Sequence, residues 1–324
     1  MDKDSIGEIR RESEFASAGK HTTLAQLQQA QKNATILCGI PEQIDRDGSL
    51  WFSFHEMKGF LPAQRADISL HLWALPPSAL EDRLGRPTCF IVSGFAEENG
   101  ETRAVLDRYA VQEQYLREVL AKHEAGDVLP CIVRTVTPAT ALCDMGLGIL
   151  AGLRLRDICM SPIHNVWDMI DCGSELHAVL NDCDADGRIL ISTRELLGTW
   201  AENITWVHEG LITTGIVRGA EEGRCYIELT PNLYAYSSRL PGKYHYGDEV
   251  AVRVSRVNEQ TGIIRVTVLS HFLEPLRFYN VGRHLDKWSY HEGRHVQIGH
   301  FSDFQWMQRK RGQSVADSQA SKNS

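Results

Sequence analysis

GDEVAVRVSRV (247–257) begins with a Gly-Asp pair and continues with Val250, Val252 and Val254 at alternate positions. Gly and Asp favour turns, and a period of two places one row of side chains on one face of a β-strand. A similar phrase, GDVLPCIVRTV, occupies residues 126–136. Looser copies are GRPTCFIVSGF (85–95), GSELHAVLNDC (173–183) and GLITTGIVRGA (210–220). A recurring turn-and-strand phrase indicates an internal repeat, which decides the fold before any single residue does.

The strand-like runs between residues 34 and 272 group into three units of five. They are 34–44, 50–56, 58–63, 87–95 and 102–108 in the first unit, 128–136, 141–146, 151–158, 175–183 and 187–194 in the second, and 211–220, 224–230, 233–238, 249–257 and 262–270 in the third. Five short strands in so few residues are typical of a small Greek-key barrel such as the OB-fold. The sequence therefore predicts a mainly β protein of three tandem five-stranded OB-type barrels joined by helical linkers.

Apolar residues at helical spacing predict linker helices over 108–124 and 193–209, and a short helix over 24–33. The predicted organisation is an N-terminal polar and helical segment (1–33), a first barrel with its linker helix (34–124), a second barrel with its linker helix (125–208), a third barrel (209–274) and a C-terminal extension with a disordered tail (275–324). Residues 273–311 interleave aromatic and basic residues, which suits either single-stranded RNA or packing onto the third barrel.

Composition excludes several classes of protein. Hydrophobic residues make up 43% of the 324 residues and charged residues 23%, which is typical of a globular chain. A formal net charge of −8 argues against a polycation that wraps nucleic acid. There is no apolar run of about 18 residues and no secretion signal, so we expect no membrane contact. The eight cysteines form no CxxC pair, which predicts reduced thiols and a cytoplasmic location.

The sequence lacks the motifs of nucleophilic and phosphoryl-transfer catalysis. DCDADG (182–187) imitates the start of a calcium loop, but Thr193 stands where the bidentate Glu is needed, and strand-like flanks favour a hairpin turn. The GxSxG motif and the Walker loop are both lacking. We therefore expect no enzyme activity, no metal, no cofactor and no small-molecule substrate.

One run of residues resembles a known module, the S1 RNA-binding domain, named for ribosomal protein S1. The resemblance is carried by GDVLPCIVRTVTPATALCDMGLGILAGLRLRDI (126–158) with HAVLNDCDADGRILISTREL (177–196), by GIVRGAEEGRCYIELTPNL (215–233) with GDEVAVRVSRVNEQTGIIRVTV (247–268), and more loosely by ATILCGIPEQ (34–43), MKGFLPA (57–63) and FIVSGF (90–95). It covers residues 34–272 and is similar to short bacterial proteins of the ribosomal protein S1-like type. The resemblance implies OB-type barrels with RNA as the usual ligand, in the setting of messenger RNA or the ribosome.

The binding face of this family typically presents two aromatic residues three positions apart and a third ring or His on the next strand. In the third unit these positions fall on Gly223, Tyr226 and Tyr234 or Tyr236, and in the first on Gly48, Trp51 and Phe60 or Leu61. In the middle unit they fall on Ala139, Leu142 and Leu155, none of which can stack on a base. The resemblance thus implies that the middle barrel is mainly structural.

Strand alternation gives an independent view of the same rings. In LWFSFHE (50–56), Phe52 and Phe54 form the inward row, so that Trp51, Ser53 and His55 point outward. An outward ring on a barrel face suits base stacking, or packing under a neighbouring barrel. The candidate RNA-contacting residues are Trp51, His55, Lys58, Arg134, Arg154, Arg218, Arg224, Tyr226, Tyr234 and Tyr236.

Two functions remain open from the sequence. The first is a cytoplasmic single-stranded RNA-binding protein that acts in translation or on messenger RNA, with the ribosome as a further partner. The second is a protein–protein adaptor or regulator whose barrels have largely lost RNA binding, which the bare middle unit and the acidic charge favour.

Overall fold

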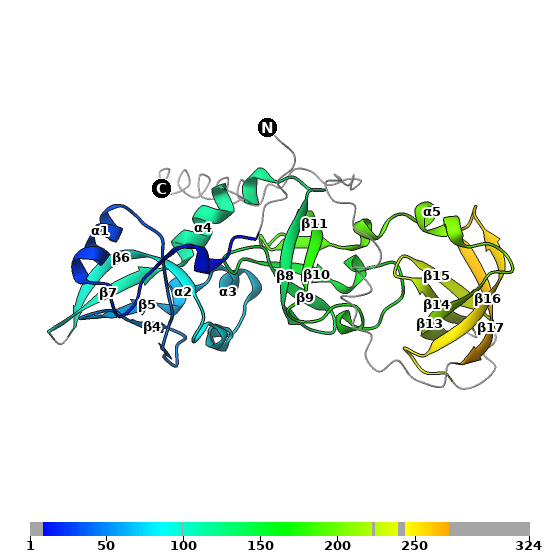
Figure 1. The fold of residues 1–324 in the computed structure, drawn as a ribbon, viewed down its shortest axis with the longest axis horizontal. Coiled ribbons are helices and arrows are strands. Elements are labelled where there is room, and N and C mark those ends of the chain that lie inside the picture. The colour runs from blue at the N-terminus through cyan, green and yellow to red at the C-terminus, as the bar shows by residue number, and fades with distance from the viewer. Residues whose placement is uncertain (1–8, 99, 119, 222–223, 239–243, 272–324) are drawn as a thin grey trace, which may run out of the picture.

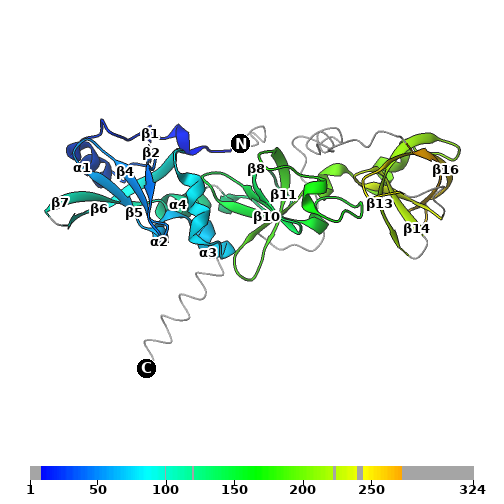
Figure 2. The same cartoon turned by 90° about the horizontal axis from the view of Figure 1, so that it is seen from below.

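The computed structural model describes residues 9–271, apart from residues 99, 119, 222–223 and 239–243. These residues form three β units that follow one another along the long axis of the molecule (Figure 1), and the view from below in Figure 2 shows the same linear order. None of the helices in these ranges is long and apolar enough to cross a membrane. The predicted C-terminal extension and tail lie outside the described residues.

The first unit is a seven-stranded sheet. Its strands are β1 (Ala16–Ser17), β2 (Leu37–Gly39), β3 (Gln43–Ile44), β4 (Leu50–Ser53), β5 (Lys58–Leu61), β6 (Thr88–Glu98) and β7 (Glu101–Asp107). They are hydrogen-bonded in the order β1-β2-β6-β7-β5-β4-β3. The sheet curls but does not close, so the prediction of three closed barrels is wrong for this unit.

The opening in the first unit lies within what the sequence predicted as one first strand. β2 pairs with β6, whereas β3 pairs with β4, so the predicted strand is divided between Gly39 and Gln43. Pro41 lies in the division and has no N–H to donate to a ladder. If β1 is left aside and β2 and β3 are counted as one divided first strand, each strand of this unit has the same neighbours as the corresponding strand of the two closed barrels.

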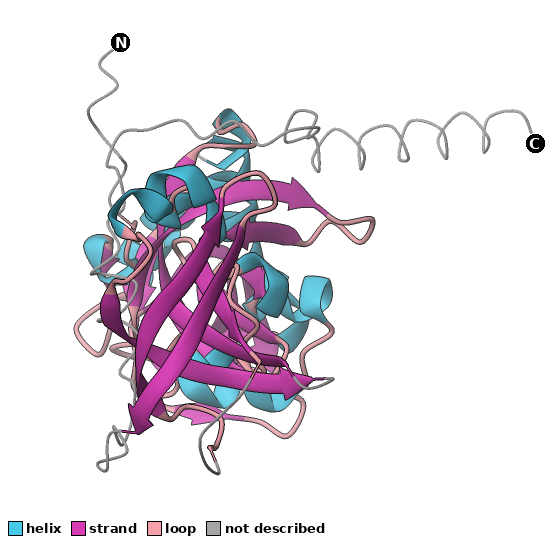
Figure 3. Ribbon diagram, turned by 90° about the vertical axis from the view of Figure 1, so that its right-hand side faces the viewer, coloured by secondary structure: helices cyan, strands magenta, loops and turns pink. Residues whose placement is uncertain are grey.

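The second and third units are closed five-stranded barrels, as predicted. The second contains β8 (Val128–Val136), β9 (Thr140–Asp144), β10 (Leu150–Arg154), β11 (Glu175–Cys183) and β12 (Ile189–Ser192), in the order β10-β12-β11-β8-β9. The third contains β13 (Ile212–Glu221), β14 (Arg224–Thr230), β15 (Leu233–Ser237), β16 (Glu249–Asn258) and β17 (Ile263–His271), in the order β13-β14-β15-β17-β16. Figure 3 looks along the long axis onto the third barrel, whose strands cross the view diagonally.

Alternation along the strands produces the barrel cores. In β16, Val250, Val252 and Val254 are 0%, 0% and 1% exposed, so the valine row that opens the sequence analysis lines the third barrel. β8 carries the similar phrase 126–136, and its inward row of Leu129, Cys131 and Val133 is buried as well. The hairpin predicted at 182–187 is confirmed between β11 and β12.

The helices confirm part of the prediction. They are α1 (Leu24–Lys32), α2 (Ala63–Ala66), α3 (Ile68–Trp73), α4 (Tyr109–Glu118) and α5 (Trp200–Asn203). α1 and α4 fall where helices were expected. The single helix expected over 193–209 is wrong: α5 has four residues between two short 3-10 helices, Arg194–Leu197 and Ile204–Trp206. Gly198 has φ +82° and breaks the helix, and Thr199 caps α5 by accepting the N–H of Glu202.

α2, α3 and a 3-10 helix over Pro77–Arg83 lie between the predicted strands 58–63 and 87–95, where no helix was predicted. α3 lies between the first unit and the second barrel in Figures 1 and 2, and its residues Ile68 and Leu72 belong to the same buried cluster as the second-barrel core. These two units therefore share a core.

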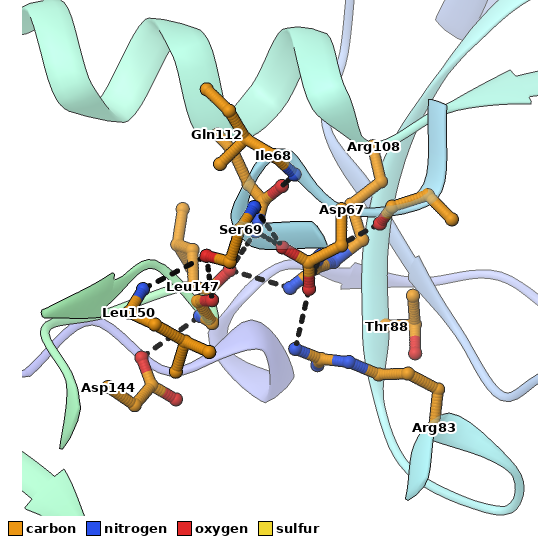
Figure 4. Close-up of polar contacts among 12 residues, drawn as sticks. Asp67, Ile68, Ser69, Arg83, Thr88, Arg108, Gln112, Asp144, Leu147 and Leu150 are labelled. Atoms are coloured by element: carbon orange, nitrogen blue, oxygen red, sulfur yellow. Dashed lines mark hydrogen bonds and ion pairs between the residues drawn. The ribbon is translucent and has the colours of Figure 1, made fainter. Parts of the chain in front are cut away.

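A buried charge network spans the same junction (Figure 4). Arg108 has no exposed surface and donates to the carboxylate of Asp67 at 2.7 Å. A second carboxylate, that of Glu12, accepts from Arg108 at 2.8 Å. Arg108 also donates to the carbonyl of Leu147 in the second barrel at 2.6 Å, and Gln112 donates to the same carbonyl at 2.9 Å. The network joins α4, the segment before α3 and the β9–β10 loop.

Glu12 brings the N-terminal segment into this network. Its carboxylate is 8% exposed and also accepts from Arg83 and from the backbone N–H of Cys89. The chain then continues into β1, which pairs in parallel with β2. The described part of the predicted N-terminal segment is thus packed into the first unit.

Candidate nucleic-acid interface

Two aromatic rings lie side by side on the outer face of the first unit. Trp51 on β4 and Phe60 on β5 are direct cross-strand partners, and their ring centroids are 4.8 Å apart. Both side chains are partly exposed, while Phe52 and Phe54 are buried as the alternation predicted. The indole N–H of Trp51 donates to Asp45 at 2.8 Å, which holds the ring in place. Trp51 and Phe60 are called the first aromatic platform below.

Basic side chains border this platform. The guanidinium carbon of Arg103 on β7 lies 4.7 Å from the ring centre of Phe60 and 5.8 Å from that of Trp51, within the range of cation–π attraction. Lys58 is the cross-strand partner of Arg103 and is exposed. His55 is also exposed and lies 3.6 Å from the carboxylate of Glu56. Nothing in the strand pattern of residues 102–108 marked Arg103 as a candidate RNA contact.

Three tyrosines form the corresponding surface on the third barrel. Tyr226 on β14 is the cross-strand partner of Tyr236 on β15, at 5.2 Å between ring centroids, and Tyr234 lies 5.6 Å from Tyr236 and 6.4 Å from Tyr226. All three side chains are partly exposed. Arg265 on β17 is the partner of Tyr236 on the other side. The three tyrosines are called the tyrosine platform.

The two platforms occupy the same place in their units. In each unit, a loop joins the second strand to the third, and outward-facing cross-strand pairs can be counted from that loop. The second such pair is Trp51–Phe60 in the first unit and Tyr226–Tyr236 in the third barrel. The structure thus selects Phe60 and Tyr236 from the alternatives that the sequence left open, and Leu61 is fully buried.

The second barrel carries no aromatic side chain of its own at that place. The equivalent pair is Leu142 on β9 and Gly152 on β10. Leu142 is 8% exposed, and Leu155, the residue expected on the third strand, lies in a 3-10 helix after β10 and packs against the core. Neither can stack on a base, as the sequence predicted.

The predicted arginines of the second barrel are paired within the chain. Arg134 donates to Asp144 from two nitrogens, at 2.8 and 3.1 Å, and Arg154 donates to Asp157 at 2.6 Å. Both arginines keep partly exposed side chains, at 47% and 34%. A phosphate would therefore have to compete with a carboxylate for each of them.

Arg218 needs a correction as a candidate RNA contact, because its side chain is 3% exposed. It donates to Glu228 at 2.7 Å and approaches the sulfur of Met169 in the second barrel at 3.5 Å. Burial by itself would lower the pKa of Arg218, but the adjacent Glu228 carboxylate outweighs burial and raises it. Arg218 thus joins two barrels. Arg224 begins β14, and its side chain is outside the described residues.

A groove of about 680 Å³ runs along the N-terminal segment between the first unit and the second barrel. Several arginines line it, but so do carboxylates: Arg83 pairs with Glu12, and Arg11 approaches Glu175 at 3.4 Å. The groove has no clear excess of positive charge to favour a phosphate. Among the described residues, no group of three or more His, Cys, Asp or Glu is placed to hold a metal ion.

Comparisons with known proteins add little to this geometry. No family model matches the sequence. No curated protein matches it either. One similar solved structure is a multidomain protein with nucleic acid binding domains from Streptococcus pneumoniae, at 12% identity over 73% of this chain and 74% of that chain, with a TM-score of 0.24. Another is a complex of a/eIF2alpha, aDim2p and rRNA from Pyrococcus horikoshii, at 21% identity over 23% of this chain and 46% of that chain, with a TM-score of 0.21. Scores this low carry no argument about function, and the S1 resemblance stays a prediction.

Proposed function

We propose that this protein binds single-stranded RNA across the outer faces of the first unit and the third barrel. The observation that carries the proposal is the repeated position of the two platforms. In both units, two adjacent and partly exposed rings form the second outward-facing cross-strand pair of the second and third strands. Exposed rings at one place in two units suit bases that stack in succession.

Stacking, rather than charge, is the main attraction in this proposal. Base–aromatic stacking contributes about 1–3 kcal/mol per base and tolerates any base. Arg103 and Lys58 beside the first platform, and Arg265 beside the tyrosines, are placed to approach phosphates. With a net charge of −8 on the whole protein, each surface binds modestly, and two surfaces on one chain raise the affinity through effective concentration.

The proposed setting is that of an S1-like protein: cytoplasmic, without a cofactor, acting on messenger RNA or at the ribosome in translation. The role is binding and not catalysis. This finer assignment depends on the sequence resemblance, whereas the RNA-binding surface is argued from the rings.

The experiment is a titration of a fluorescent single-stranded RNA with wild type and with the double variant Trp51→Ala, Tyr226→Ala over a salt series. If the two contributions add, affinity falls by about 2–6 kcal/mol, at least about 30-fold. The salt slope stays shallow and unchanged, because neither ring neutralises a phosphate. Trp167→Ala is the matched control: Trp167 is 49% exposed, but it lies in a 3-10 helix (Val166–Asp168) of the second barrel and belongs to neither platform. A double variant that binds as tightly as the control refutes the proposal.

A protein–protein adaptor is the second candidate. The observation that favours it is the pairing of Arg134, Arg154 and Arg218 with carboxylates of the same chain, which removes the charges that an RNA-binding barrel would use. Wild type without measurable RNA affinity at low salt is the result expected of an adaptor.

A further inference from the structure

The outer face of the second barrel is occupied by a tryptophan from the first unit. Trp73, the last residue of α3, donates its indole N–H to the carbonyl of Leu150 on β10 at 3.1 Å. Its ring also reaches Gly152, the residue that stands in this barrel where Phe60 and Tyr236 stand in the others. Trp73 therefore brings an aromatic ring to the one unit whose strands lack it at this position.

Gly152 is what admits the ring. A Cβ on Gly152 would lie 2.3 Å from Cη2 of Trp73 and 3.2 Å from both Cζ2 and Cζ3, so the ring meets the strand with its edge. The φ angle of Gly152 is not in the left-handed region, so the backbone itself does not require glycine here. A glycine inside a strand often marks such a close approach. The side chain of Trp73 remains partly exposed.

An arginine accompanies Trp73 as Arg103 accompanies the first platform. The guanidinium carbon of Arg188 lies 5.5 Å from the ring centre of Trp73. Ile189 pairs with Ala151 in a parallel ladder, so Arg188, the residue before Ile189, lies beside Leu150. Leu150 is two residues before Gly152. Arg103 is the partner of Lys58, two residues before Phe60. Arg103 on β7 and Arg188 directly before β12 therefore hold equivalent places beside the third strands of their units.

We propose that Trp73 completes a third aromatic platform, a composite one, in which a helix of the first unit supplies the stacking ring for the second barrel. The ligand is a base of the same single-stranded RNA, so this inference rests on the proposed function. The N–H bond to Leu150 and the contact with Gly152 hold the ring before RNA arrives, which reduces the ordering cost of stacking. RNA then crosses three stacking surfaces rather than two.

The direct test is photocrosslinking of full-length wild type with single-stranded RNA that carries 5-iodouridine, followed by mass spectrometry of the peptides. We expect crosslinks at Trp73 as well as at Trp51. In titrations, Trp73→Leu fills much of the same space without an aromatic face and lowers RNA affinity by about 5- to 150-fold, the range for loss of one stacked base. Trp73→Phe keeps most of the affinity.

Gly152→Ala tests the same ring from the opposite side. The added methyl displaces the indole, so RNA affinity falls as in Trp73→Leu, and the double variant is no weaker than Trp73→Leu alone. Gly94→Ala is the matched control, since a Cβ there meets nothing within 4 Å and its φ is not left-handed. A melting curve for each variant reports any loss of packing separately from binding.

One result overturns the inference while leaving the proposed function intact: Trp51 crosslinks, Trp73 does not, and Trp73→Leu melts earlier but binds RNA as tightly as wild type. Trp73 is then only a packing residue between units. If neither the platform variants nor Trp73→Leu changes RNA affinity, the proposed function fails together with it.

Discussion

Replacement of Arg108 by Met tests whether the buried charge network holds the first unit and the second barrel together. Arg108 is fully buried between Glu12 and Asp67, and it donates to the carbonyls of Ala66 and Leu147. Met fills similar volume but leaves both carboxylates buried without their main cation. Removal of one partner of a buried ion pair costs about 3–5 kcal/mol. At about 2–4 °C per kcal/mol for a unit of this size, the melting temperature falls by roughly 6–20 °C.

The assay is thermal and urea unfolding followed by circular dichroism at pH 7. Arg253→Met is the matched control, because Arg253 is exposed on β16 and its loss should change stability by no more than about 0.5 kcal/mol. A variant Arg108→Met that unfolds at the same urea concentration as Arg253→Met refutes the account of the junction.

Acid gives a second measure of the same network. Burial alone would raise the pKa of Glu12, but Arg108 and Arg83 outweigh burial and lower the pKa from 4.5 to about 2. A lowered carboxyl pKa stabilises the folded state fully above pH 4.5, and this contribution, about 3 kcal/mol, is lost as the pH falls from 4.5 towards 2. Glu12→Gln should be less stable than wild type at pH 7 and should lose less stability over that acid range. Equal acid sensitivity of the two proteins would contradict the assignment.

Three further predictions concern Arg218, Lys58 and Cys172. Arg218→Met leaves Glu228 buried without its cation and lowers stability by about 3–5 kcal/mol in urea unfolding, with no change in the salt slope of RNA binding. Lys58→Ala does the reverse: stability stays within about 0.5 kcal/mol, and the salt slope becomes shallower by about 0.7 if this lysine contacts one phosphate. Only one thiol of the native protein should react rapidly with a disulfide reagent at pH 8, because Cys172 is exposed and the other cysteines are buried. Burial raises the pKa of one of these buried thiols, Cys159, to about 12. Cys172→Ser should therefore abolish the rapid reaction.

The barrels could be predicted because their signal is local. Valines at alternate positions in 249–257 define an inward row whatever the rest of the chain does, and the structure buries all of that row. The division of the first strand was also marked in the sequence, by Pro41 within the predicted run 34–44. The broken helix over 193–209 had a comparable marker in Gly198. At both places a proline or glycine overrides the hydrophobic spacing.

The junctions could not be predicted in the same way. Arg108 opens an ordinary amphipathic helix, and its burial depends on Glu12 and Asp67, which approach it only after the chain has folded. For the same reason Arg218 looked like any arginine on a barrel strand. The contact of Trp73 was marked only weakly in the sequence, and only at Gly152, which interrupts an apolar strand. Nothing in the sequence near Gly152 shows which side chain fills the space above it.

The junctions also determine how weak surfaces act together. The first two units share a core and a buried ion network. The third barrel is joined to the second by Arg218, which donates to the sulfur of Met169, and by hydrogen bonds from Ser161 to Pro231 and Thr230. Units held in this way present their rings at fixed separations. In the proposed function, an RNA bound at one platform would therefore meet the next as an intramolecular event. Only RNA long enough to reach both gains from this arrangement. The proposed function therefore reconciles an acidic chain with a polyanionic ligand: the inter-unit contacts, and not an excess of arginine on the surface, would combine the separate stacking affinities.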